Sequence, residues 1–284
     1  MPGQTVTVLD DADRYGESFA DVYDDWYGTA FDTEGAVERL AGLVELAAGA
    51  PALELGVGTG RLAVPLADRG AFVVAVDASP SMLDQLAARL EAEPPSPPGR
   101  VVAVPADMAD VAAAVRAAPD VPDGGYGLVW CAYNTFLNLH TEAAQRRCLA
   151  GVAELLSPRG ALVIEAYVPA APEDIERTSL DVSRVTTDAV VLTCTEHDAA
   201  NQVVTGQHVE LRDGSVRLRP WRIRYLSPDQ LDTMAAAVGL ELCDRWSDWR
   251  GGRFEDGADD DADDDGAELS DVHVSVYRRA GDRG

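Results

Sequence analysis

The sequence predicts an α/β protein: a doubly wound, mostly parallel seven-stranded sheet with an antiparallel β insert. Three observations lead to this fold class. Short apolar runs alternate with helical patterns from residue 52 to residue 167, which is the order that builds parallel βαβ units. From residue 184 to residue 225 the hydrophobic period becomes two, as in antiparallel hairpins. The first apolar run also leads into a loop with glycine at every second position.

Residues 1–48 are expected to form an N-terminal helical lid. Four aromatic residues follow one another at steps of four and three, so one helix would carry them along a single face: Tyr15, Phe19, Tyr23 and Trp26. A second helical pattern covers residues 34–48. The aromatic face can pack the helix against the core, cover a ligand, or do both.

Residues 49–169 carry the alternation of strands and helices. Ser79 and Pro80 suit the cap and the first turn of a helix, and the proline-rich run after residue 93 ends it. Residues 157–160, Ser-Pro-Arg-Gly, are expected to form a turn. The predicted strands cover residues 52–56, 72–77, 100–104, 127–132 and 161–167, and the predicted helices residues 61–69, 79–93 and 142–156.

Residues 170–226 form the antiparallel insert of three or four strands, including 190–196, 203–211 and 216–225. The insert is expected to serve the substrate or lid, or to join two copies, so a homodimer is among the expected assemblies. Residues 227–284 return to the main sheet, with a helix at 228–238 and strands at 240–249 and 272–278. Between these strands residues 255–268 hold nine acids in fourteen positions, an expected disordered loop for solubility or for steering a cationic substrate.

The composition excludes several classes of function. The formal charge of the 284-residue chain is −26, and all 23 basic residues are arginine. The absence of lysine excludes a P-loop lysine and a pyridoxal Schiff base. The acidity argues against a nucleic-acid partner, because phosphate binding needs a basic face. A basic run, Arg217, Arg219, Arg222 and Arg224, alternates as a solvated strand face would, with binding of an anionic substrate group as the second interpretation.

No metal site is expected, because the four cysteines lack a C-x-x-C spacing and nearby paired histidines. Cys131, Cys148, Cys194 and Cys243 are interpreted as small buried residues of a reduced protein. The N-terminal residues lack a charged-then-apolar signal, and no apolar run approaches the length of a membrane span. We therefore expect a soluble cytoplasmic protein without a membrane partner.

The glycine loop predicts a nucleoside cofactor site. Glycines at 56, 58 and 60 allow a sharp turn and a close approach of the backbone to a ligand. Asp77, at the end of the next strand, is placed to accept hydrogen bonds from ribose hydroxyls. The third glycine comes one residue earlier than in dinucleotide-binding loops, and Arg61 takes its usual place. Glu54 would repel a pyrophosphate but attract the ammonium group of an amino-acid-bearing nucleoside.

The runs E-x-G-x-G-x-G and V-D-A-S-x-x-M-L together resemble the class I S-adenosylmethionine-dependent methyltransferases over residues 15–167. The resemblance implies a Rossmann-like methyltransferase fold, S-adenosyl-L-methionine as the cofactor and a small-molecule acceptor. In this family Glu54 and the glycines would hold the methionine end, Asp77 the ribose diol, and Asp107 the adenine amino group, unless Asp107 merely caps a helix. The implied cofactor contacts are Tyr15, Glu54, Gly56, Gly58, Gly60, Asp77, Ala78, Ser79, Met82, Asp107, Met108 and Ala132.

The sequence leaves two alternatives for the acceptor atom that receives the methyl group, nitrogen or oxygen. Methyl transfer depends on alignment and on exclusion of water, and Tyr23 and Asn134 are the candidates for aiming an amine, although Asn134 would equally suit a loop cap. A hydroxyl acceptor needs a base, for which His140 is the best placed of the four histidines. The insert and the tyrosine pair at 15 and 23 resemble bacterial N-methyltransferases of antibiotic and aminosugar pathways. The amine is favoured because the acidic surface suits a cationic substrate and none of the four histidines is compellingly placed.

Two further classes stay open. A protein on the same scaffold could bind the cofactor and transfer no methyl group, and a nicotinamide oxidoreductase is a more distant alternative. Incubation with labelled cofactor and candidate amines and alcohols would separate a non-methylating cofactor-binding protein from a methyltransferase. A melting temperature raised by a nicotinamide dinucleotide, rather than by S-adenosylhomocysteine, would indicate the oxidoreductase.

Overall fold

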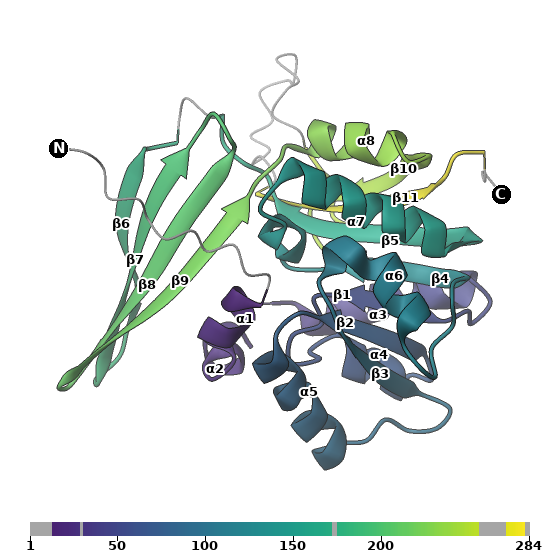
Figure 1. The fold of residues 1–284 in the computed structure, drawn as a ribbon, viewed down its shortest axis with the longest axis horizontal. Coiled ribbons are helices and arrows are strands. Elements are labelled where there is room, and N and C mark those ends of the chain that lie inside the picture. Colours follow the sequence, from purple (N-terminus) through teal and green to yellow (C-terminus); the bar gives the residue numbers. More distant parts are fainter. Residues whose placement is uncertain (1–12, 29–30, 172–174, 256–270, 282–284) are drawn as a thin grey trace.

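A computed structural model describes residues 13–28, 31–171, 175–255 and 271–281. Two sheets organise the chain (Figure 1): a seven-stranded sheet in the order β10-β11-β5-β4-β1-β2-β3, and a four-stranded sheet in the order β6-β7-β8-β9. The predicted fold class is confirmed. The acidic loop predicted at 255–268 lies outside the described residues except for Glu255.

The main sheet is parallel from β1 to β5, whereas β11 is antiparallel to both of its neighbours. The strand order reverses between β1 and β4, and open α/β sheets bind ligands beyond the carboxyl ends of the strands at such a point. Its strands are β1 (Ala52–Leu55), β2 (Phe72–Asp77), β3 (Arg100–Pro105), β4 (Tyr126–Cys131), β5 (Leu156–Tyr167), β10 (Leu240–Trp246) and β11 (Val272–Arg279).

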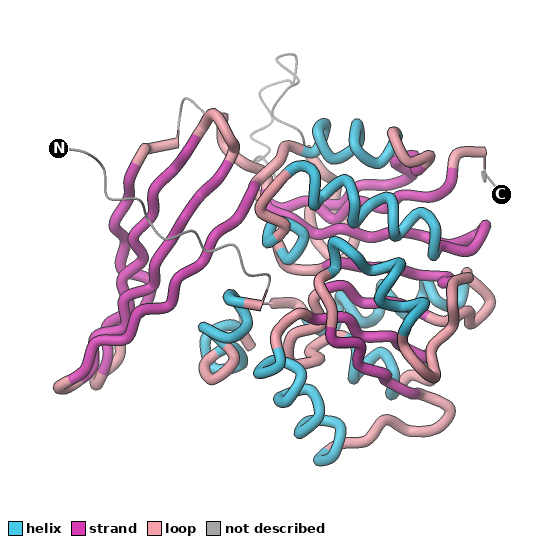
Figure 2. The backbone as a smooth tube through the Cα atoms, viewed as in Figure 1, coloured by secondary structure: helices cyan, strands magenta, loops and turns pink. Residues whose placement is uncertain are grey.

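Helices cover both faces of the main sheet (Figure 2), and each face has its own apolar layer. One layer buries residues of α3 (Thr33–Leu46), α4 (Ala63–Asp68) and α5 (Pro80–Ala92). The other buries residues of α6 (Val111–Ala117), α7 (Glu142–Leu155) and α8 (Pro228–Ala236). Two short 3₁₀ turns, η1 (Met108–Asp110) and η2 (Thr135–Asn138), follow β3 and β4. Ser79 caps α5 by accepting from the Met82 amide at 3.2 Å, as its sequence predicts.

Several boundaries differ from the prediction, and two of these differences have a clear structural reason. Residues 157–160 do not form a turn, because β5 begins at Leu156 directly after α7. Arginines of β11 stabilise this extension: Arg278 donates to the Arg159 carbonyl at 2.9 Å and Arg279 to the Leu156 carbonyl at 3.0 Å. Helix α4 begins at Ala63, two residues later than expected, because the glycine loop continues turning through Leu62.

The N-terminal aromatic segment forms two short helices, α1 (Arg14–Phe19) and α2 (Tyr23–Tyr27), so the prediction of one helix is wrong. Val22 leaves the helical region with φ −126°. The aromatic side chains still pack together: Phe19 is fully buried and stacks on Tyr15 at 4.6 Å between ring centroids. The pair of helices lies between α5 and the second sheet (Figure 1), contacting both.

The second sheet consists of β6 (Thr178–Val185), β7 (Ala189–Asp198), β8 (Val203–Arg212) and β9 (Ser215–Arg224), all antiparallel. The solvated arginine face predicted on β9 is wrong for Arg219 and Arg224, which are 1% and 7% exposed. Arg219 pairs with Asp21 at 2.7 Å and with Glu210 at 3.1 Å. Asp21 from the N-terminal segment and Glu210 from the neighbouring strand β8 neutralise a charge that the local pattern places in solvent.

The cysteines are all free, and the expectation of burial holds for Cys131 and Cys148 only. Cys194 is partly exposed, and Cys243 is exposed, because β10 is an edge strand of the main sheet. Within the described ranges, none of the helices combines the length and the apolar character that a membrane span requires.

Candidate functional site

The glycine loop leaves β1 at the point where the strand order reverses. Gly56 and Gly58 have φ of +68° and +56°, a left-handed conformation that costs a residue with a side chain free energy. The amide of Gly58 donates to one carboxylate oxygen of Asp77 at 2.8 Å, and the Ser79 amide donates to the other at 2.9 Å. Asp77 therefore holds the loop to the end of β2. Burial raises the pKa of its carboxyl group, although the Ser79 and Gly58 amides oppose that shift.

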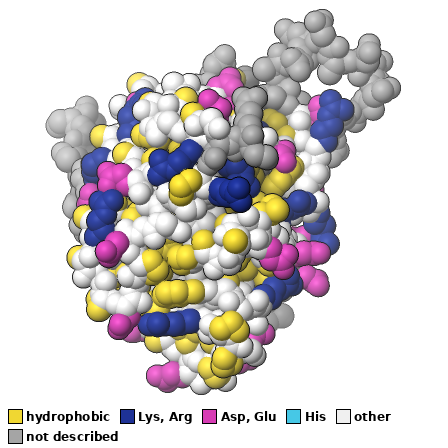
Figure 3. All heavy atoms as spheres, turned by 90° about the vertical axis from the view of Figure 1, so that its right-hand side faces the viewer, with side chains coloured by type: hydrophobic (Ala, Val, Ile, Leu, Met, Phe, Trp, Pro, Cys, Tyr) yellow, Lys and Arg dark blue, Asp and Glu magenta, His cyan; other side chains and the backbone are white. Residues whose placement is uncertain are grey.

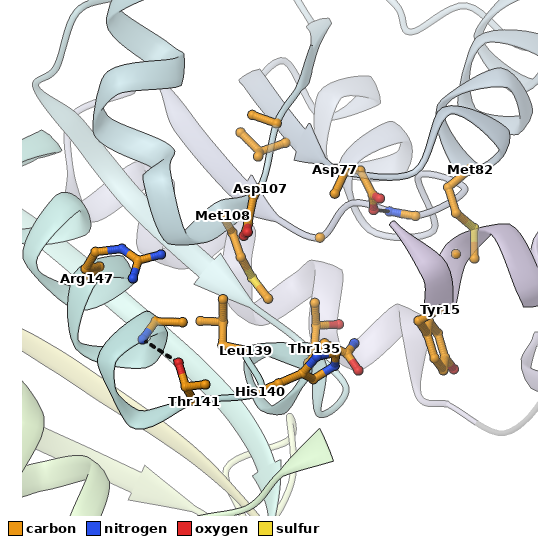
Figure 4. A pocket seen from close by; sticks show the side chains of 18 of the residues that line it. Tyr15, Asp77, Met82, Asp107, Met108, Thr135, Leu139, His140, Thr141 and Arg147 are labelled. Atoms are coloured by element: carbon orange, nitrogen blue, oxygen red, sulfur yellow. Dashed lines mark hydrogen bonds between the residues drawn. The ribbon is translucent and has the colours of Figure 1, made fainter. Parts of the chain in front are cut away.

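A cavity of about 390 Å³ opens beside this loop (Figure 4), within the size range of small-molecule sites. Asp77 and Met82 lie on one side of it, and Thr135 and His140 on the other. Ten residues predicted for the site line it: Tyr15, Tyr23, Gly56, Gly58, Asp77, Ala78, Met82, Asp107, Met108 and His140. Further wall residues were not predicted: Gly16, Val76, Ala106, Thr135, Asn138, Leu139, Thr141, Ala144 and Arg147.

The wall fits a nucleoside with an amino-acid tail. Asp77 presents a carboxylate, Met82 and Met108 present thioether side chains that pack on flat rings, and the glycines leave backbone groups accessible. Asp107 caps η1 by accepting from the Ala109 amide at 2.8 Å and also lines the cavity. Both predicted roles of Asp107 are therefore compatible with one position.

Four predicted contact residues lie outside this wall: Glu54, Gly60, Ser79 and Ala132. Glu54 is 4% exposed in β1, and burial raises its pKa to about 8. A Cβ on Gly60 would meet Leu86 Cδ1 at 2.4 Å, so this glycine lets α5 pack closely. The Ser79 hydroxyl donates to Glu17 at 2.6 Å. Their roles as cofactor contacts stay predictions.

Asn134 joins the ends of β4 and β5. Its side-chain oxygen accepts from the Tyr167 amide at 2.7 Å, and its own amide donates to the Glu165 carbonyl at 3.2 Å. Tyr133 and Asn134 have φ of +52° and +59°. Two consecutive left-handed residues without glycine are costly and concentrate at functional sites. The expected loop-cap bond of Asn134 is absent, and the residue instead lines a second cavity.

The second cavity measures about 160 Å³ and is mostly aromatic. It shares Tyr15, Tyr23, Thr135 and Asn138 with the first cavity, so the two adjoin. Burial raises the pKa of all five of its tyrosines, that of Tyr133 to about 12. These phenols stay protonated near neutral pH and act as hydrogen-bond donors. The full wall is Tyr15, Tyr23, Tyr27, Tyr133, Asn134, Thr135, Asn138, Tyr167, His208, Trp221 and Ile223.

The four histidines lie in different parts of the structure. His140 lines the first cavity and His208 the second. His208 contacts the Thr193 hydroxyl through Nδ1 at 2.7 Å, and its pKa is lowered by burial and then by Arg219. His197 is buried against the Tyr225 hydroxyl at 2.6 Å. His273 is buried in β11, as expected of a structural residue, and burial lowers its pKa to about 3.

A third cavity of about 350 Å³ adjoins the second through Tyr133 and Asn134. Arg61 stacks over the Phe31 ring at 4.4 Å, and Glu165 accepts from the Tyr133 amide at 2.6 Å. Burial raises the pKa of the Glu165 carboxyl group. Charged and apolar side chains both line this cavity: Phe31, Asp32, Arg61, Tyr133, Asn134, Glu165, Ser247, Asp248, Trp249 and Val272.

Sequence patterns missed most of the second cavity. Tyr27, Trp221 and Ile223 come from α2 and β9, and His208 was ranked below His140. The alternation of β9 was the one available signal, since it places Trp221 and Ile223 on one face. Among the described residues, no cluster of three or more His, Cys, Asp or Glu side chains could hold a metal ion.

Comparison with known proteins identifies relatives over most of the chain. The family described as "Methyltransferase domain" matches residues 52–160. Cypemycin N-terminal methyltransferase from a Streptomyces species is 29% identical over 201 residues, covering 68% of this chain and 74% of the relative.

Solved structures extend the likeness to nearly the full length. The CcbJ methyltransferase from Streptomyces caelestis is 36% identical, with a TM-score of 0.79 over 95% of this chain and 99% of that one. An S-adenosylmethionine-dependent methyltransferase from Clostridium acetobutylicum shares the fold, with a TM-score of 0.72 at 13% identity over 93% of this chain and 99% of that one.

Proposed function

The chain belongs to the class I S-adenosylmethionine-dependent methyltransferases, and from that premise we propose that it methylates an amine nitrogen of a small natural product or aminosugar. The first cavity is the proposed cofactor site, and the second is the proposed acceptor site. The observation that carries the proposal is the aromatic cavity next to the glycine-loop cavity, with Tyr15 and Tyr23 on both walls.

The protein's contribution would be alignment. When bound, S-adenosylmethionine supplies an electrophilic methyl group on a sulfonium centre. The glycine loop, Asp77 and Asp107 would hold it in the first cavity. Tyr15 and Tyr23 would lie at the junction, exclude water and direct the acceptor lone pair. Positioning of this kind is worth about 7–11 kcal/mol of the barrier, enough for an intrinsically nucleophilic amine.

The lining of the second cavity favours an amine over a hydroxyl. Tyrosine and tryptophan faces attract cations, so five tyrosines and Trp221 suit a substrate that arrives as an ammonium ion. Their raised pKa values make the phenols unsuitable as bases near neutral pH. An ammonium ion can release its proton to water before attack, so the amine needs no protein base. The name of the relative from Streptomyces, which refers to the N-terminus of cypemycin, is consistent with nitrogen methylation.

The test uses methyl-labelled cofactor and pairs of small acceptors with one carbon skeleton, one bearing an amine and its partner a hydroxyl at the same position. Fragment masses locate the label. Label on nitrogen, with no label on the hydroxyl partner, supports the proposal. Label on oxygen alone would overturn it. Cofactor binding without transfer to any member of the panel would favour the non-methylating alternative.

A hydroxyl acceptor is the second candidate, and one observation favours it. His208 contacts the Thr193 hydroxyl, which in turn contacts the hydroxyl of Ser183. Ser183 is exposed on β6, so a row of hydrogen-bonding groups leads from the acceptor cavity to solvent. Such a row would carry away a proton taken from a hydroxyl.

The methylation rates of variants at these residues distinguish an amine acceptor from a hydroxyl acceptor. For an amine, His208→Asn and His140→Asn should each keep the rate within roughly tenfold, because general-base catalysis contributes about 10²–10⁴-fold. Loss of Tyr23 or Asn134 should reduce it more. For a hydroxyl, His208→Asn should lose about a hundredfold or more while retaining cofactor binding.

A further inference from the structure

The second cavity is lined without acidic or arginine side chains. Among the described residues of its wall, none is an aspartate, a glutamate or an arginine. By contrast, the surface at the end of the molecule opposite the second sheet mixes apolar side chains with arginines and acids (Figure 3). Because the cavity wall offers no carboxylate or guanidinium for an ion pair, it discriminates between ligands by shape, aromatic contact and hydrogen bonds.

The second cavity is also small for a whole acceptor. It measures about 160 Å³, whereas sites for drug-sized ligands typically measure roughly 300–1,000 Å³. The cavity can therefore hold only the part of an acceptor that carries the reacting amine. A side chain that sets the depth of this cavity would decide which substituents next to the amine fit.

Trp221 of β9 forms part of the cavity wall and lies over Gly206 of β8. The two residues are direct partners in the strand register, so their side-chain positions share one face of the sheet. A Cβ on Gly206 would meet three carbon atoms of the indole ring at 2.0, 2.1 and 2.7 Å. The φ of Gly206 lies outside the left-handed region, so the backbone would accept an alanine. Glycine is needed here because the indole occupies the space of a side chain.

Neighbouring side chains hold the indole of Trp221 from both strands. On β8, the His208 ring lies 6.0 Å from the indole between ring centroids, and its Nδ1 contacts the Thr193 hydroxyl at 2.7 Å. On β9, Arg219 is buried and pairs with Asp21 at 2.7 Å. The indole Nε1 is buried without a hydrogen-bond partner among the described residues, so packing sets the position of the ring. The open space beside the indole is the cavity itself, and a displaced ring would move into it.

We propose that Trp221, seated on Gly206, sets the size of the group that an acceptor can carry next to its reacting amine. An alanine at position 206 would have to move the ring from 2.0 Å to an ordinary van der Waals distance of 3.4 Å, a shift of about 1.4 Å. A single methylene in an apolar pocket changes kcat/KM by about 10–200-fold, so a shift of this size is enough to exclude a substituent. The inference rests on the proposed function, because it takes the second cavity as the acceptor site.

A series of cyclohexylamines tests the size limit. The ring carbon next to the amine carries hydrogen, methyl, ethyl or propyl, and kcat/KM for methyl transfer is measured for each member. Trp221→Phe keeps an aromatic face and enlarges the cavity, so it should raise kcat/KM by about 10–200-fold for the smallest member that the wild type rejects. Gly206→Ala should act in the opposite direction and lower kcat/KM by a similar factor for the largest member that the wild type methylates.

Three controls separate the size of the cavity from damage to the fold. The wall of the first cavity contains neither Gly206 nor Trp221, so both variants should bind S-adenosylhomocysteine as the wild type does. Gly42→Ala adds the same methyl group on α3 with no heavy atom within 4 Å, and should leave the size profile unchanged. A phenyl ring lacks the second ring of the indole, so Trp221→Phe added to Gly206→Ala should restore the stability that Gly206→Ala loses.

The outcomes distinguish this inference from the proposed function. Nitrogen methylation by the wild type with unchanged size profiles in Trp221→Phe and Gly206→Ala would overturn the inference alone. Binding of the amines to the complex with S-adenosylhomocysteine, without transfer from S-adenosylmethionine, would contradict the proposed function alone, and the dissociation constants of the series would then measure the size limit. If the wild type neither binds nor methylates any member, the second cavity does not take such amines and both proposals fail.

Discussion

Replacing Gly58 by alanine separates cofactor binding from folding. Gly58 has φ +56°, and the heavy atom nearest to a new Cβ is Met82 Sδ at 4.0 Å. The methyl group would therefore stand in open space beside the first cavity instead of colliding with the core. Its cost to the fold is the left-handed conformation, about 1–2 kcal/mol. A ligand that approaches the loop closely would also clash with the new methyl group, and this steric penalty is separate from the cost to folding.

The effect on affinity follows from that geometry. Forcing an extra methyl group into a close contact typically costs about 1–3 kcal/mol, which corresponds to roughly five- to 150-fold weaker binding. The loop cannot easily withdraw, because the Gly58 amide is held by Asp77 at 2.8 Å. We therefore expect S-adenosylhomocysteine to bind Gly58→Ala at least about fivefold more weakly than the wild type.

Gly214→Ala is the matched control. Gly214 has φ +74° in the turn between β8 and β9, with no heavy atom within 4 Å of a new Cβ. Urea denaturation should show similar losses of unfolding free energy in both variants, and calorimetry should show weaker S-adenosylhomocysteine binding only for Gly58→Ala. A folded Gly58→Ala protein that binds within twofold of wild type would refute the assignment of this loop.

Three further outcomes are expected. Asp77→Asn should weaken S-adenosylhomocysteine binding roughly tenfold to a hundredfold in calorimetry, because hydrogen bonds to a charged group are worth about 1.5–3 kcal/mol. The control Asp84→Asn, at an exposed position on α5, should bind as wild type does. If Asp77→Asn and wild type bind with equal affinity, Asp77 faces elsewhere. Burial raises the Glu54 pKa from 4.5 to about 8, so the folded state keeps a proton that the unfolded state releases, and stability falls as pH rises through that window. In urea titrations, the unfolding free energy of Glu54→Gln should therefore fall less between pH 5 and pH 8 than that of wild type. An equal fall in both proteins would contradict the raised pKa. Arg219→Met should cost about 1.5–3 kcal/mol of unfolding free energy, because it removes the hydrogen bond to one buried oxygen of Glu210 while Arg212 keeps the other. Adding Glu210→Gln should recover part of that loss. A double variant as unstable as the single one would show that the ion pair is not the cause.

The proposed cofactor half of the site was predictable because its residues are close in the sequence. Gly56, Gly58, Asp77 and Met82 belong to one βαβ unit, whose geometry follows from strand-loop-helix order. The structure brings all four to one cavity. Asp107 and Met108 follow the next strand and reach the same cavity because parallel strands present their carboxyl ends on one edge.

The proposed acceptor half could not be predicted in the same way. Its wall combines Tyr15 and Tyr27 from the N-terminal helices, Tyr167 from β5, and His208 and Trp221 from the second sheet. No local pattern states that these segments meet. The expectation that His140 would be the histidine nearest to an acceptor followed from its proximity to β4 in the sequence, whereas the second sheet brings His208 to the aromatic cavity.

The sequence by itself therefore determined the fold class, the glycine loop and the family, because hydrophobic period, glycine spacing and strand-end carboxylates are local properties that survive in any context. Only the tertiary structure decided that Arg219 is buried, that the N-terminal segment breaks into two helices, and that the aromatic cavity exists. The burial of Arg219 and the aromatic cavity depend on segments more than a hundred residues apart, such as Asp21 for Arg219. Pairing and burial between distant segments override the local preference that the sequence pattern expresses.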